Sequence, residues 1–339
     1  MKKLKIFLLL FALAFSLTSC RHKENPGQGS ATLTSDTELS GLNEGIAKNP
    51  ADASLYARRA DYFLKAEKLN NALADVNKAV ELKPDVPGPY LTLSRIYVLM
   101  GKPQQSLEAL NKIVALDPAN IQAYLEKAKL CLVMKDYTNC AENVQKVLDL
   151  DPRNADAYYL KGVVLDENGQ PAKALASFRQ AVQFDPAHFD ALMHLGYASI
   201  ESKPGMATDY FNSALKVNPA SLEAMYNLGM LYQENGKPEK ALEMYASMLK
   251  INPVNKLALY NSGYVNLVYL QKYPAGTEFF TKAIAVDSTY AEAFYNRGYC
   301  YELSGNPAKA RQDYEKALKL KANDPRSVQA LNRLDKLKP

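Results

Sequence analysis

Large and small residues recur along this chain with a period of about 34 residues. Counted from Pro50, prolines recur at residues 84, 118, 152, 186, 219 and 253, at intervals of 34, 34, 34, 34, 33 and 34 residues. When each proline is counted as about the thirty-second residue of a repeat, eight repeats begin at Ala53, Pro87, Ile121, Ala155, Phe189, Leu222, Lys256 and Ala291. Such a period is typical of an array in which each repeat packs only on its neighbours.

Within each repeat, bulky and slim residues hold fixed positions. The fourth residue is large: Tyr56, Tyr90, Tyr124, Tyr158, Leu192, Met225, Leu259 and Phe294. The eighth is small: Ala60, Ser94, Ala128, Gly162, Gly196, Gly229, Gly263 and Gly298. A second slim residue follows twelve positions later in several repeats: Ala72, Ser106, Cys140, Ala174 and Ala241. This spacing lets two antiparallel helices approach closely and interlock, so it predicts two helices in each repeat.

A glycine and a proline punctuate every second repeat. The glycines are Gly101, Gly169, Gly236 and Gly305. The pair Gly236-Lys237 is not part of a phosphate-binding loop, because Leu231 stands where that motif needs glycine and Pro238 where it needs Ser or Thr. We expect Gly236 to end the first helix in the left-handed conformation, and Pro238 to lie in the first turn of the second helix.

These features resemble the tetratricopeptide repeat family over residues 53–324. The resemblance implies an all-α fold, a right-handed superhelical solenoid of about eight helix-turn-helix repeats with terminal capping helices. Because the first and last repeats must cover their outer faces, residues 36–52 are predicted to form a degenerate leading helix and residues 325–339 a C-terminal capping helix.

The start of the chain has the composition of a secretion signal. A basic segment precedes the apolar run Ile6–Leu17, which is too short for a comfortable bilayer span. Leu17-Thr18-Ser19-Cys20 resembles the bacterial lipoprotein box. The resemblance implies that residues 1–19 are a signal peptide and that Cys20 becomes the lipidated N-terminus; the alternative is an ordinary cleaved signal in which Cys20 is incidental.

The segment after Cys20 bears on where the protein is located. Residues 20–35 are mostly polar and contain Gly and Pro, which predicts a disordered tether. Arg21 is not the aspartate that retains lipoproteins in the inner membrane of enterobacteria, so the outer membrane is favoured. We therefore expect a lipid-anchored protein of the cell envelope, on the periplasmic face or at the cell surface.

Charge argues against a nucleic-acid partner. The formal net charge is +5, and Lys2, Lys3 and Lys5 of the signal supply three of these charges. Without them no basic footprint remains along most of the chain. Residues 309–339 hold nine Lys or Arg against four Asp or Glu, a segment that could contact an anionic membrane or partner, or could simply be a solvated helix end.

The sequence offers little for catalysis or metal binding. Its three histidines, His22, His188 and His194, follow no metal-ligand spacing, and no nucleophile–base arrangement is visible. We therefore expect neither an enzyme nor a bound cofactor or metal. Cys131 and Cys140 could form a disulfide in an oxidising compartment, but the predicted helix pairing places them about a turn out of opposition, which favours two buried thiols.

The resemblance also implies a binding face. In the family, residues two, five, six, nine, twelve and thirteen of each first helix line the concave side. The residues predicted to line a peptide-binding groove are Tyr159, His194, Tyr197, Tyr226, Asn227, Met230, Tyr260, Asn261, Tyr264, Tyr295, Asn296 and Tyr299. An Asn amide can donate to and accept from an extended peptide backbone, and Tyr adds flat contact area. The alternative is that Tyr and Asn only fill the inner curve.

Three hypotheses for the function follow. The first is a membrane-anchored scaffold that binds partner proteins or extended peptides on its concave face, in envelope assembly, secretion or control of peptidoglycan enzymes. The second is a fixed structural subunit of a larger envelope complex, contacting through its convex face or caps. The third is a glycan-binding groove, since aromatic surfaces stack on sugars.

Overall fold

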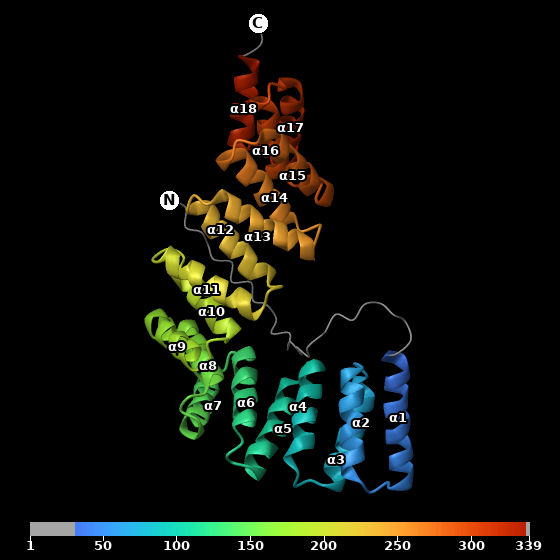
Figure 1. The fold of residues 1–339 in the computed structure, drawn as a ribbon. Coiled ribbons are helices and arrows are strands. Elements are labelled where there is room, and N and C mark those ends of the chain that lie inside the picture. Colours follow the sequence, from blue (N-terminus) through green and yellow to red (C-terminus); the bar gives the residue numbers. More distant parts are fainter. Residues whose placement is uncertain (1–30, 337–339) are drawn as a thin grey trace. The chain divides into compact units, whose positions relative to one another are not determined.

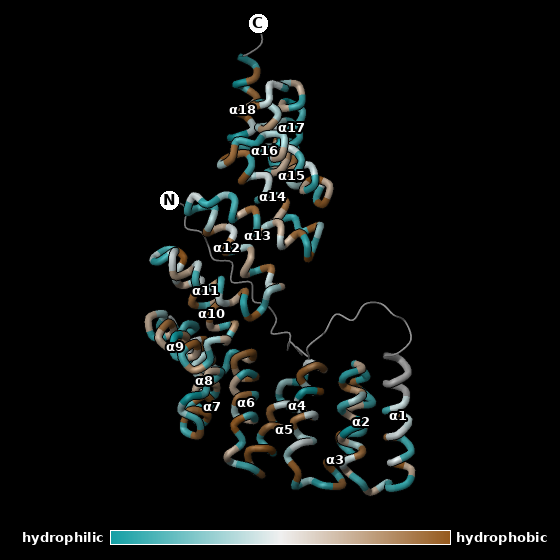
Figure 2. Tube along the Cα trace, viewed as in Figure 1, coloured by the Kyte–Doolittle hydropathy of each residue, from teal (hydrophilic) through white to brown (hydrophobic). Residues whose placement is uncertain are grey.

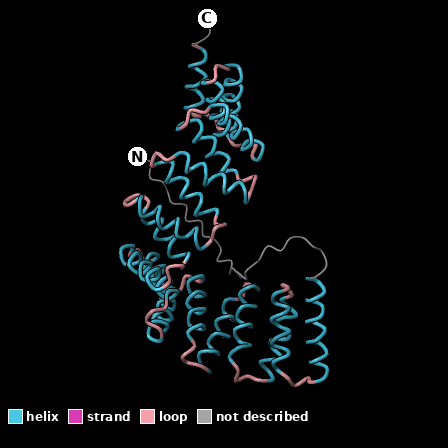
Figure 3. Tube along the Cα trace, in the orientation of Figure 1, coloured by secondary structure: helices cyan, strands magenta, loops and turns pink. Residues whose placement is uncertain are grey.

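Every regular element in the described part of the chain, residues 31–336, is a helix (Figures 1 and 3). This computed structural model contains eighteen α-helices and one π-helix within those residues. It confirms the predicted all-α helical repeat solenoid. The predicted signal peptide 1–19, the lipidation site Cys20 and most of the predicted tether lie outside the described residues.

The chain divides into two compact lobes, Met1–Ala174 and Leu175–Pro339, and the division falls within α9 (Pro171–Phe184). The helices of the first lobe before α9 are α1 (Ala31–Lys48), α2 (Ala53–Lys65), α3 (Leu69–Leu82), α4 (Pro87–Leu99), α5 (Pro103–Leu116), α6 (Ile121–Val133), α7 (Tyr137–Leu150) and α8 (Ala155–Glu167). The even-numbered helices from α2 to α8 begin at the residues where the sequence period starts a repeat.

The second lobe continues the same alternation of first and second helices. Its helices after α9 are α10 (Phe189–Ser199), α11 (Pro204–Val217), α12 (Leu222–Glu234), α13 (Pro238–Ile251), α14 (Lys256–Tyr264), the π-helix η1 (Val265–Tyr269), α15 (Tyr273–Val286), α16 (Ala291–Leu303), α17 (Pro307–Leu320) and α18 (Pro325–Asp335). Here too α10, α12, α14 and α16 begin where the period starts a repeat.

The leading helix differs from the sequence expectation. A tether through residue 35 and a helix over 36–52 were predicted, whereas α1 spans Ala31–Lys48. The last helix-breaking residues before it are Pro26 and Gly29, so nothing in residues 31–35 interrupts a helix. Leu42 on α1 is only 3 % exposed, which ties this helix to the array.

Chain reversals between the two helices of a repeat use left-handed residues. Gly236 has φ +67° and Gly101 has φ +69°, as expected for residues that end a helix. In other repeats Glu67, Lys135 and Gln271 adopt φ between 52° and 58° at the same place. The left-handed conformation costs a non-glycine residue more strain energy than it costs glycine. The chain reversal is therefore set by the packing of the two helices as well as by the local residue.

Two repeats depart from the common length, and the structure shows where. Repeat 5 is one residue short, and between α10 and α11 it has no left-handed residue. Repeat 7 has one residue more than the common length. The extra residue lies in η1, where the first helix widens into a π-turn after Gly263. Both changes fall after the small eighth residue, so the close helix contact at that residue is kept.

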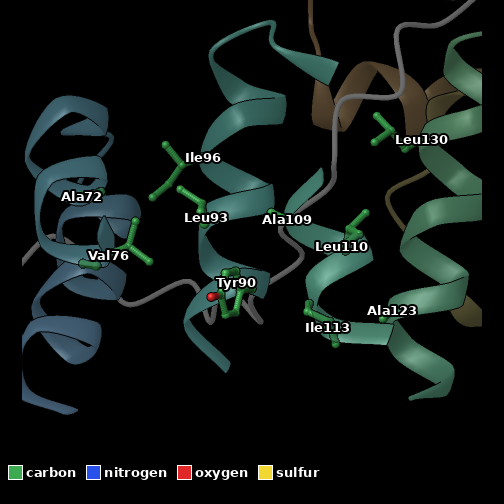
Figure 4. Packing of buried hydrophobic residues seen from close by; sticks show 11 residues of the cluster. Ala72, Val76, Tyr90, Leu93, Ile96, Ala109, Leu110, Ile113, Ala123 and Leu130 are labelled. Carbon is green, nitrogen blue, oxygen red and sulfur yellow. The ribbon is translucent and has the colours of Figure 1, made fainter. Parts of the chain in front are cut away.

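The core runs between consecutive helices rather than around one centre. In the first lobe, Val76 of α3, Leu93 and Ile96 of α4, and Leu110 and Ile113 of α5 belong to one buried cluster (Figure 4). Apolar and polar stretches alternate along each helix, as Figure 2 shows. Each helix therefore buries one stripe against its neighbours and leaves the other in solvent.

An arginine ties three helices together in the first repeat. Arg59 on α2 donates through Nε and Nη2 to the carboxylate of Asp75 on α3, at 2.6 and 2.7 Å, and through Nη1 to Asn43 on α1, at 2.8 Å. The Arg59 and Asp75 side chains are 21 % and 9 % exposed, so this is a largely desolvated two-point contact.

The last repeat repeats this arrangement. Arg297 on α16 donates to Asp313 on α17 at 2.7 and 2.8 Å, and to Thr281 on α15 at 3.2 Å. Thr281 precedes its arginine by the same sixteen residues that separate Asn43 from Arg59. The leading helix α1 therefore occupies the place of the second helix of a preceding repeat.

Candidate binding face on the first helices

The predicted groove residues divide unevenly between the lobes. Tyr159 lies on α8 of the first lobe, and the other eleven lie on α10, α12, α14 and α16 of the second. Asn261 and Asn296 are 8 % and 6 % exposed, while Tyr159 and the remaining nine are half-buried. The second lobe thus brings its predicted residues onto successive first helices.

Two of the asparagines brace neighbouring first helices. Asn296 on α16 donates from Nδ2 to the Tyr260 hydroxyl on α14, at 2.8 Å. Asn261 on α14 donates to the Leu257 carbonyl of its own helix at 2.8 Å. Burial raises the pKa of Tyr226 on α12, and a hydrogen bond from Asn261 to that tyrosine opposes the rise. Each asparagine therefore reaches back to a tyrosine of the repeat before it.

Asn227 makes a similar contact to a different tyrosine. Its Nδ2 donates to the Glu223 carbonyl at 2.8 Å and to the Tyr197 hydroxyl on α10 at 3.2 Å. Tyr197 in turn donates its own proton to Glu223 Oε1 at 2.5 Å. Burial and the Glu223 carboxylate both raise the pKa of Tyr197, so this hydroxyl stays a donor.

These contacts change the role expected of the asparagines. From the sequence, each amide was expected to donate to and accept from a peptide backbone. In the structure, both hydrogens of Asn227 Nδ2 already have acceptors inside the chain. In the half-buried Asn227, Oδ1 is the part of the amide that these hydrogen bonds leave unused. The tyrosine rings, which the amides hold in place, become the main contact surface of this face.

The tyrosines form a connected set of rings around α14. Tyr260 and Tyr264 stack with centroids 6.4 Å apart, and Tyr260 lies 5.0 Å from Tyr290. Tyr264 also meets Tyr269 of the π-helix edge-on at 6.3 Å. Burial raises the pKa of Tyr260 and Tyr290. The Tyr260 and Tyr290 hydroxyls therefore keep their protons at neutral pH.

The C-terminal helix α18 extends this face with two arginines that the sequence argument missed. The Arg326 guanidinium lies 4.8 Å from the Tyr295 ring centroid, and Arg333 lies 6.0 Å from that of Tyr299. Arg333 also donates to both carboxylate oxygens of Glu302, at 2.6 and 2.7 Å. Continuing the 34-residue period past Ala291 starts a ninth helix at Pro325 and would have placed both arginines at inner-face positions.

The other predicted residues have ordinary surroundings. His194 stacks on Phe178 with centroids 4.7 Å apart and an angle of 20° between the planes. Met230 is half-buried on α12. Two surface hollows of about 510 Å³ lie beside α11, lined by residues such as Asp209 and Lys237, and none of the predicted groove residues lines either.

The cysteines in the described part of the chain are free and buried. They are Cys131, Cys140 and Cys300. Burial raises the pKa of Cys140 and of Cys300 to about 12, which keeps these sulfurs as unreactive thiols at neutral pH. The structure thus has Cys131 and Cys140 as the two buried thiols that the helix pairing favoured.

Neither a metal site nor a membrane-spanning helix is found within residues 31–336. No group of three or more His, Cys, Asp or Glu side chains could hold a metal ion there. No helix in this range is both long and apolar enough to cross a bilayer.

Comparison with known families gives the relationship directly. Models described as "Tetratricopeptide repeat" match residues 222–255 and 291–324, residues 144–176, and residues 162–201. The chain belongs to the tetratricopeptide repeat family. A further model, described as "ChAPs (Chs5p-Arf1p-binding proteins)", matches residues 30–118. As a tetratricopeptide repeat protein, the chain is a scaffold for protein partners, of a family that is generally not enzymatic.

Two solved structures are among those similar to this chain. The PilF protein of Pseudomonas aeruginosa is 18 % identical, with 64 % of this chain and 98 % of that one covered and a TM-score of 0.50. The C-terminal part of a tetratricopeptide repeat protein from Cytophaga hutchinsonii is 17 % identical, with 81 % and 99 % covered and a TM-score of 0.49. At these identities the likeness concerns the fold alone.

Proposed function

We propose that this tetratricopeptide repeat protein is anchored to the cell envelope by a lipid on Cys20 and binds extended segments of partner proteins on the inner face of its second lobe. The observation that carries the proposal is the series of tyrosines on α10, α12 and α14, each hydrogen-bonded by an asparagine of the following repeat. Envelope assembly, secretion and control of peptidoglycan enzymes are the processes in which such a scaffold would act.

Fixed tyrosine rings suit the binding of an extended segment. A tyrosine offers a large flat apolar surface with a polar tip, and it loses little conformational freedom on binding. In this face the Asn–Tyr hydrogen bonds hold rings such as Tyr260 before any partner arrives, which lowers the entropic cost of association. The amide oxygen of the half-buried Asn227 can accept from a backbone N–H group of the segment.

A photo-crosslinker placed on two faces of the second lobe tests where partners bind. Benzoylphenylalanine would replace Met230 or Tyr264 on the inner face and, separately, Ile251 or Val286 at the ends of second helices. We expect partners to be captured in intact cells from the inner positions and not from the outer ones. Capture from the outer positions alone would contradict the inner-face proposal.

The lipid anchor has its own test. Wild type and Cys20→Ser would be grown with radiolabelled palmitate and fractionated. We expect the wild type to incorporate label and to sediment with outer membranes, and Cys20→Ser to lose both properties. Unlabelled wild-type protein in the soluble fraction would contradict the anchor and leave the inner-face test unaffected.

One observation favours the second candidate function, a fixed structural subunit. The last residue of several second helices is apolar and 41–47 % exposed: Leu116, Leu150, Val217, Ile251 and Val286. An apolar side chain that recurs at one edge in successive repeats could pack against a neighbouring protein. The outer crosslinking positions Ile251 and Val286 belong to this series, so the same experiment decides between the two functions.

A further inference from the structure

The second helix of the last repeat, α17, differs in charge from the three second helices before it, α11, α13 and α15. In α11, α13 and α15, acidic and basic residues are equal in number: Asp209 with Lys216, Glu239 and Glu243 with Lys240 and Lys250, and Glu278 with Lys282. In α17, four basic residues face two acidic ones: Lys309, Arg311, Lys316 and Lys319 against Asp313 and Glu315. Helix α9 also carries an excess of two, Lys173 and Arg179 with no acidic residue. From α11 onward the excess is confined to the last repeat.

Most carboxylates near this end are already engaged inside the protein. Asp313 accepts both donors of Arg297, and Asp335 accepts from Arg311 at 2.6 Å. Asp324 accepts from the backbone N–H and the hydroxyl of Ser327 at the start of α18. These acidic groups neutralise arginines or cap a helix. The carboxylate left beside the three lysines of α17 is that of the exposed Glu315, one helical turn before Lys319.

Three of those lysines form one stripe. Lys309, Lys316 and Lys319 are exposed, and none of them forms a side-chain hydrogen bond or ion pair with a described residue. At 3.6 residues per turn they lie within about 80° of one another around the helix and along roughly 15 Å of its axis. Lys309 and Lys316 lie over the Tyr301 and Phe294 rings, at 5.5 and 6.0 Å, which limits their freedom.

Near the C-terminal end the arginines bind carboxylates of the protein and the lysines of α17 do not, and this difference indicates the kind of ligand. Arg297 and Arg333 are each committed to a carboxylate by two hydrogen bonds. The free cations are lysines, which act as hydrated point charges and lack the planar fork that selects one carboxylate or phosphate. Lysines on an exposed helix face, with no pocket around them, suit a diffuse layer of negative charge better than a single bound anion.

We propose that the lysine stripe of α17 rests on an anionic lipid bilayer. The proposal takes a nearby membrane from the proposed function, but the contact itself is electrostatic and does not require the lipid anchor. Each lysine close to an anionic surface raises the partition coefficient roughly five-fold, so the three lysines of the stripe contribute roughly a hundred-fold.

Vesicle binding tests the proposal. The full chain carrying Cys20→Ser, which cannot be lipidated, would be sedimented with phosphatidylcholine vesicles and with vesicles containing phosphatidylglycerol. The apolar segment 6–17 contributes to both, so the measured quantity is the excess binding to the anionic vesicles. We expect a clear excess at about 50 mM salt and its loss at about 500 mM, because salt screens exposed charges.

A matched pair of variants separates the stripe from net charge. K309Q/K316Q/K319Q removes the stripe, and K112Q/K146Q/K250Q removes three exposed lysines from α5, α7 and α13. We expect the first variant to lose the excess binding by at least ten-fold and the second to keep it within about two-fold. Helical circular dichroism would check that both variants are folded. Equal losses in the two would overturn the proposal.

The lysine stripe could instead bind an acidic protein segment, and the same assay distinguishes this ligand from a membrane. Polyglutamate would be added as a competitor at the charge concentration of the anionic vesicles. Binding to polyglutamate that exceeds vesicle binding and depends on the stripe would overturn the membrane assignment in favour of an acidic segment. Failure of the inner-face crosslinking or of palmitate labelling would bear on the proposed function alone.

Discussion

The two lobes bring the helices of a repeat together in different ways. In the second lobe, a Cβ atom at Gly229 would lie 2.7 Å from the Tyr245 ring, and one at Gly196 would lie 2.7 Å from the Phe211 ring. In the first three repeats, which lie in the first lobe, the eighth position holds Ala60, Ser94 and Ala128. The positions that correspond to those rings hold Val76, Leu110 and Val144.

The residue allowed at the eighth position depends on the side chain that faces it from the second helix. A buried aromatic ring on the second helix needs a glycine opposite it, whereas an aliphatic side chain leaves room for Ala or Ser. Gly263 and Gly298 follow the same rule against Phe280 and Tyr314. The second lobe therefore fills its helix interfaces with rings, and the first lobe fills them with branched side chains.

The largest effect is expected from forcing a side chain against a ring. Gly229→Val should lower the free energy of unfolding by about 3 kcal/mol, because the Tyr245 ring must move out of a packed site. Ala128→Gly in the first lobe should cost only about 1 kcal/mol, the usual loss of helix propensity. Urea unfolding, with hydrogen exchange to locate the change, measures both.

Shrinking the ring at the same time should reverse much of the damage. Gly229→Val combined with Tyr245→Val imitates the first lobe, and a double-mutant cycle gives the interaction between the two sites. If the two losses simply add, the clash is not the cause, and the comparison between the lobes does not hold at this position.

The second largest effect is expected at alkaline pH, where the second lobe should lose stability before the first. The tyrosines of the second lobe whose pKa is raised, chiefly by burial, are Tyr197, Tyr226, Tyr245, Tyr260, Tyr290, Tyr295 and Tyr314. In the first lobe, the pKa of Tyr137 is raised by its hydrogen bond to Glu167. A raised pKa in the folded state means that the unfolded chain loses its proton first. Stability is therefore complete below the unfolded pKa of about 10 and falls as the pH rises above it.

Tryptophan reporters can follow each lobe, because the chain has no tryptophan of its own. Tyr97→Trp would report on the first lobe and Tyr232→Trp on the second. We expect the fluorescence of the second reporter to change at lower pH than that of the first. The same midpoint for both reporters would show that the buried tyrosines do not set the alkaline limit.

A smaller effect should distinguish the asparagines of the two lobes. Asn296→Ala removes the bond from α16 to Tyr260 on α14 and should cost about 1–1.5 kcal/mol. Asn143→Ala in the first lobe removes a bond to Asn139 of its own helix and should cost about 0.5 kcal/mol. Both side chains are buried, so they form a matched pair for urea unfolding. Equal costs would mean that bracing between helices adds nothing.

The smallest effect is expected at exposed ion pairs, where the lobes should not differ. Glu44 and Lys48 on α1, and Glu278 and Lys282 on α15, each pair at 2.6 Å one helical turn apart. Lys48→Ala and Lys282→Ala should each change the free energy of unfolding by less than about 0.5 kcal/mol. A larger loss in one lobe would reveal a contribution from outside the helix interfaces.

Much of the fold could be predicted from the sequence because repetition multiplies weak signals. The starts of the first helices and the left-handed Gly236 follow from spacing that recurs in several repeats. The ring that makes Gly229 obligatory lies sixteen residues away, and its contact depends on how the two helices cross. The π-turn at Val265–Tyr269 arises from one extra residue, and nothing in its own sequence marks it.

The candidate face was predictable in position but not in role. Tyr226, Asn227 and their counterparts stand on successive first helices, as the period requires. Which polar atom meets which neighbour depends on distances between repeats, which a single repeat does not contain. The donation from Asn296 to Tyr260 is therefore visible only in three dimensions. Arg326 and Arg333 were missed because the period was not followed beyond the eighth repeat.

The shared arginine contact of the first and last repeats has a consequence for engineering. Asn43 on α1 accepts from Arg59 as Thr281 on α15 accepts from Arg297, so the first repeat already carries the joint that an ordinary preceding repeat would use. Extra repeats inserted between α1 and α2 would find a compatible neighbour on each side. The array can thus be lengthened from its beginning, while α18 stays in place as its terminus.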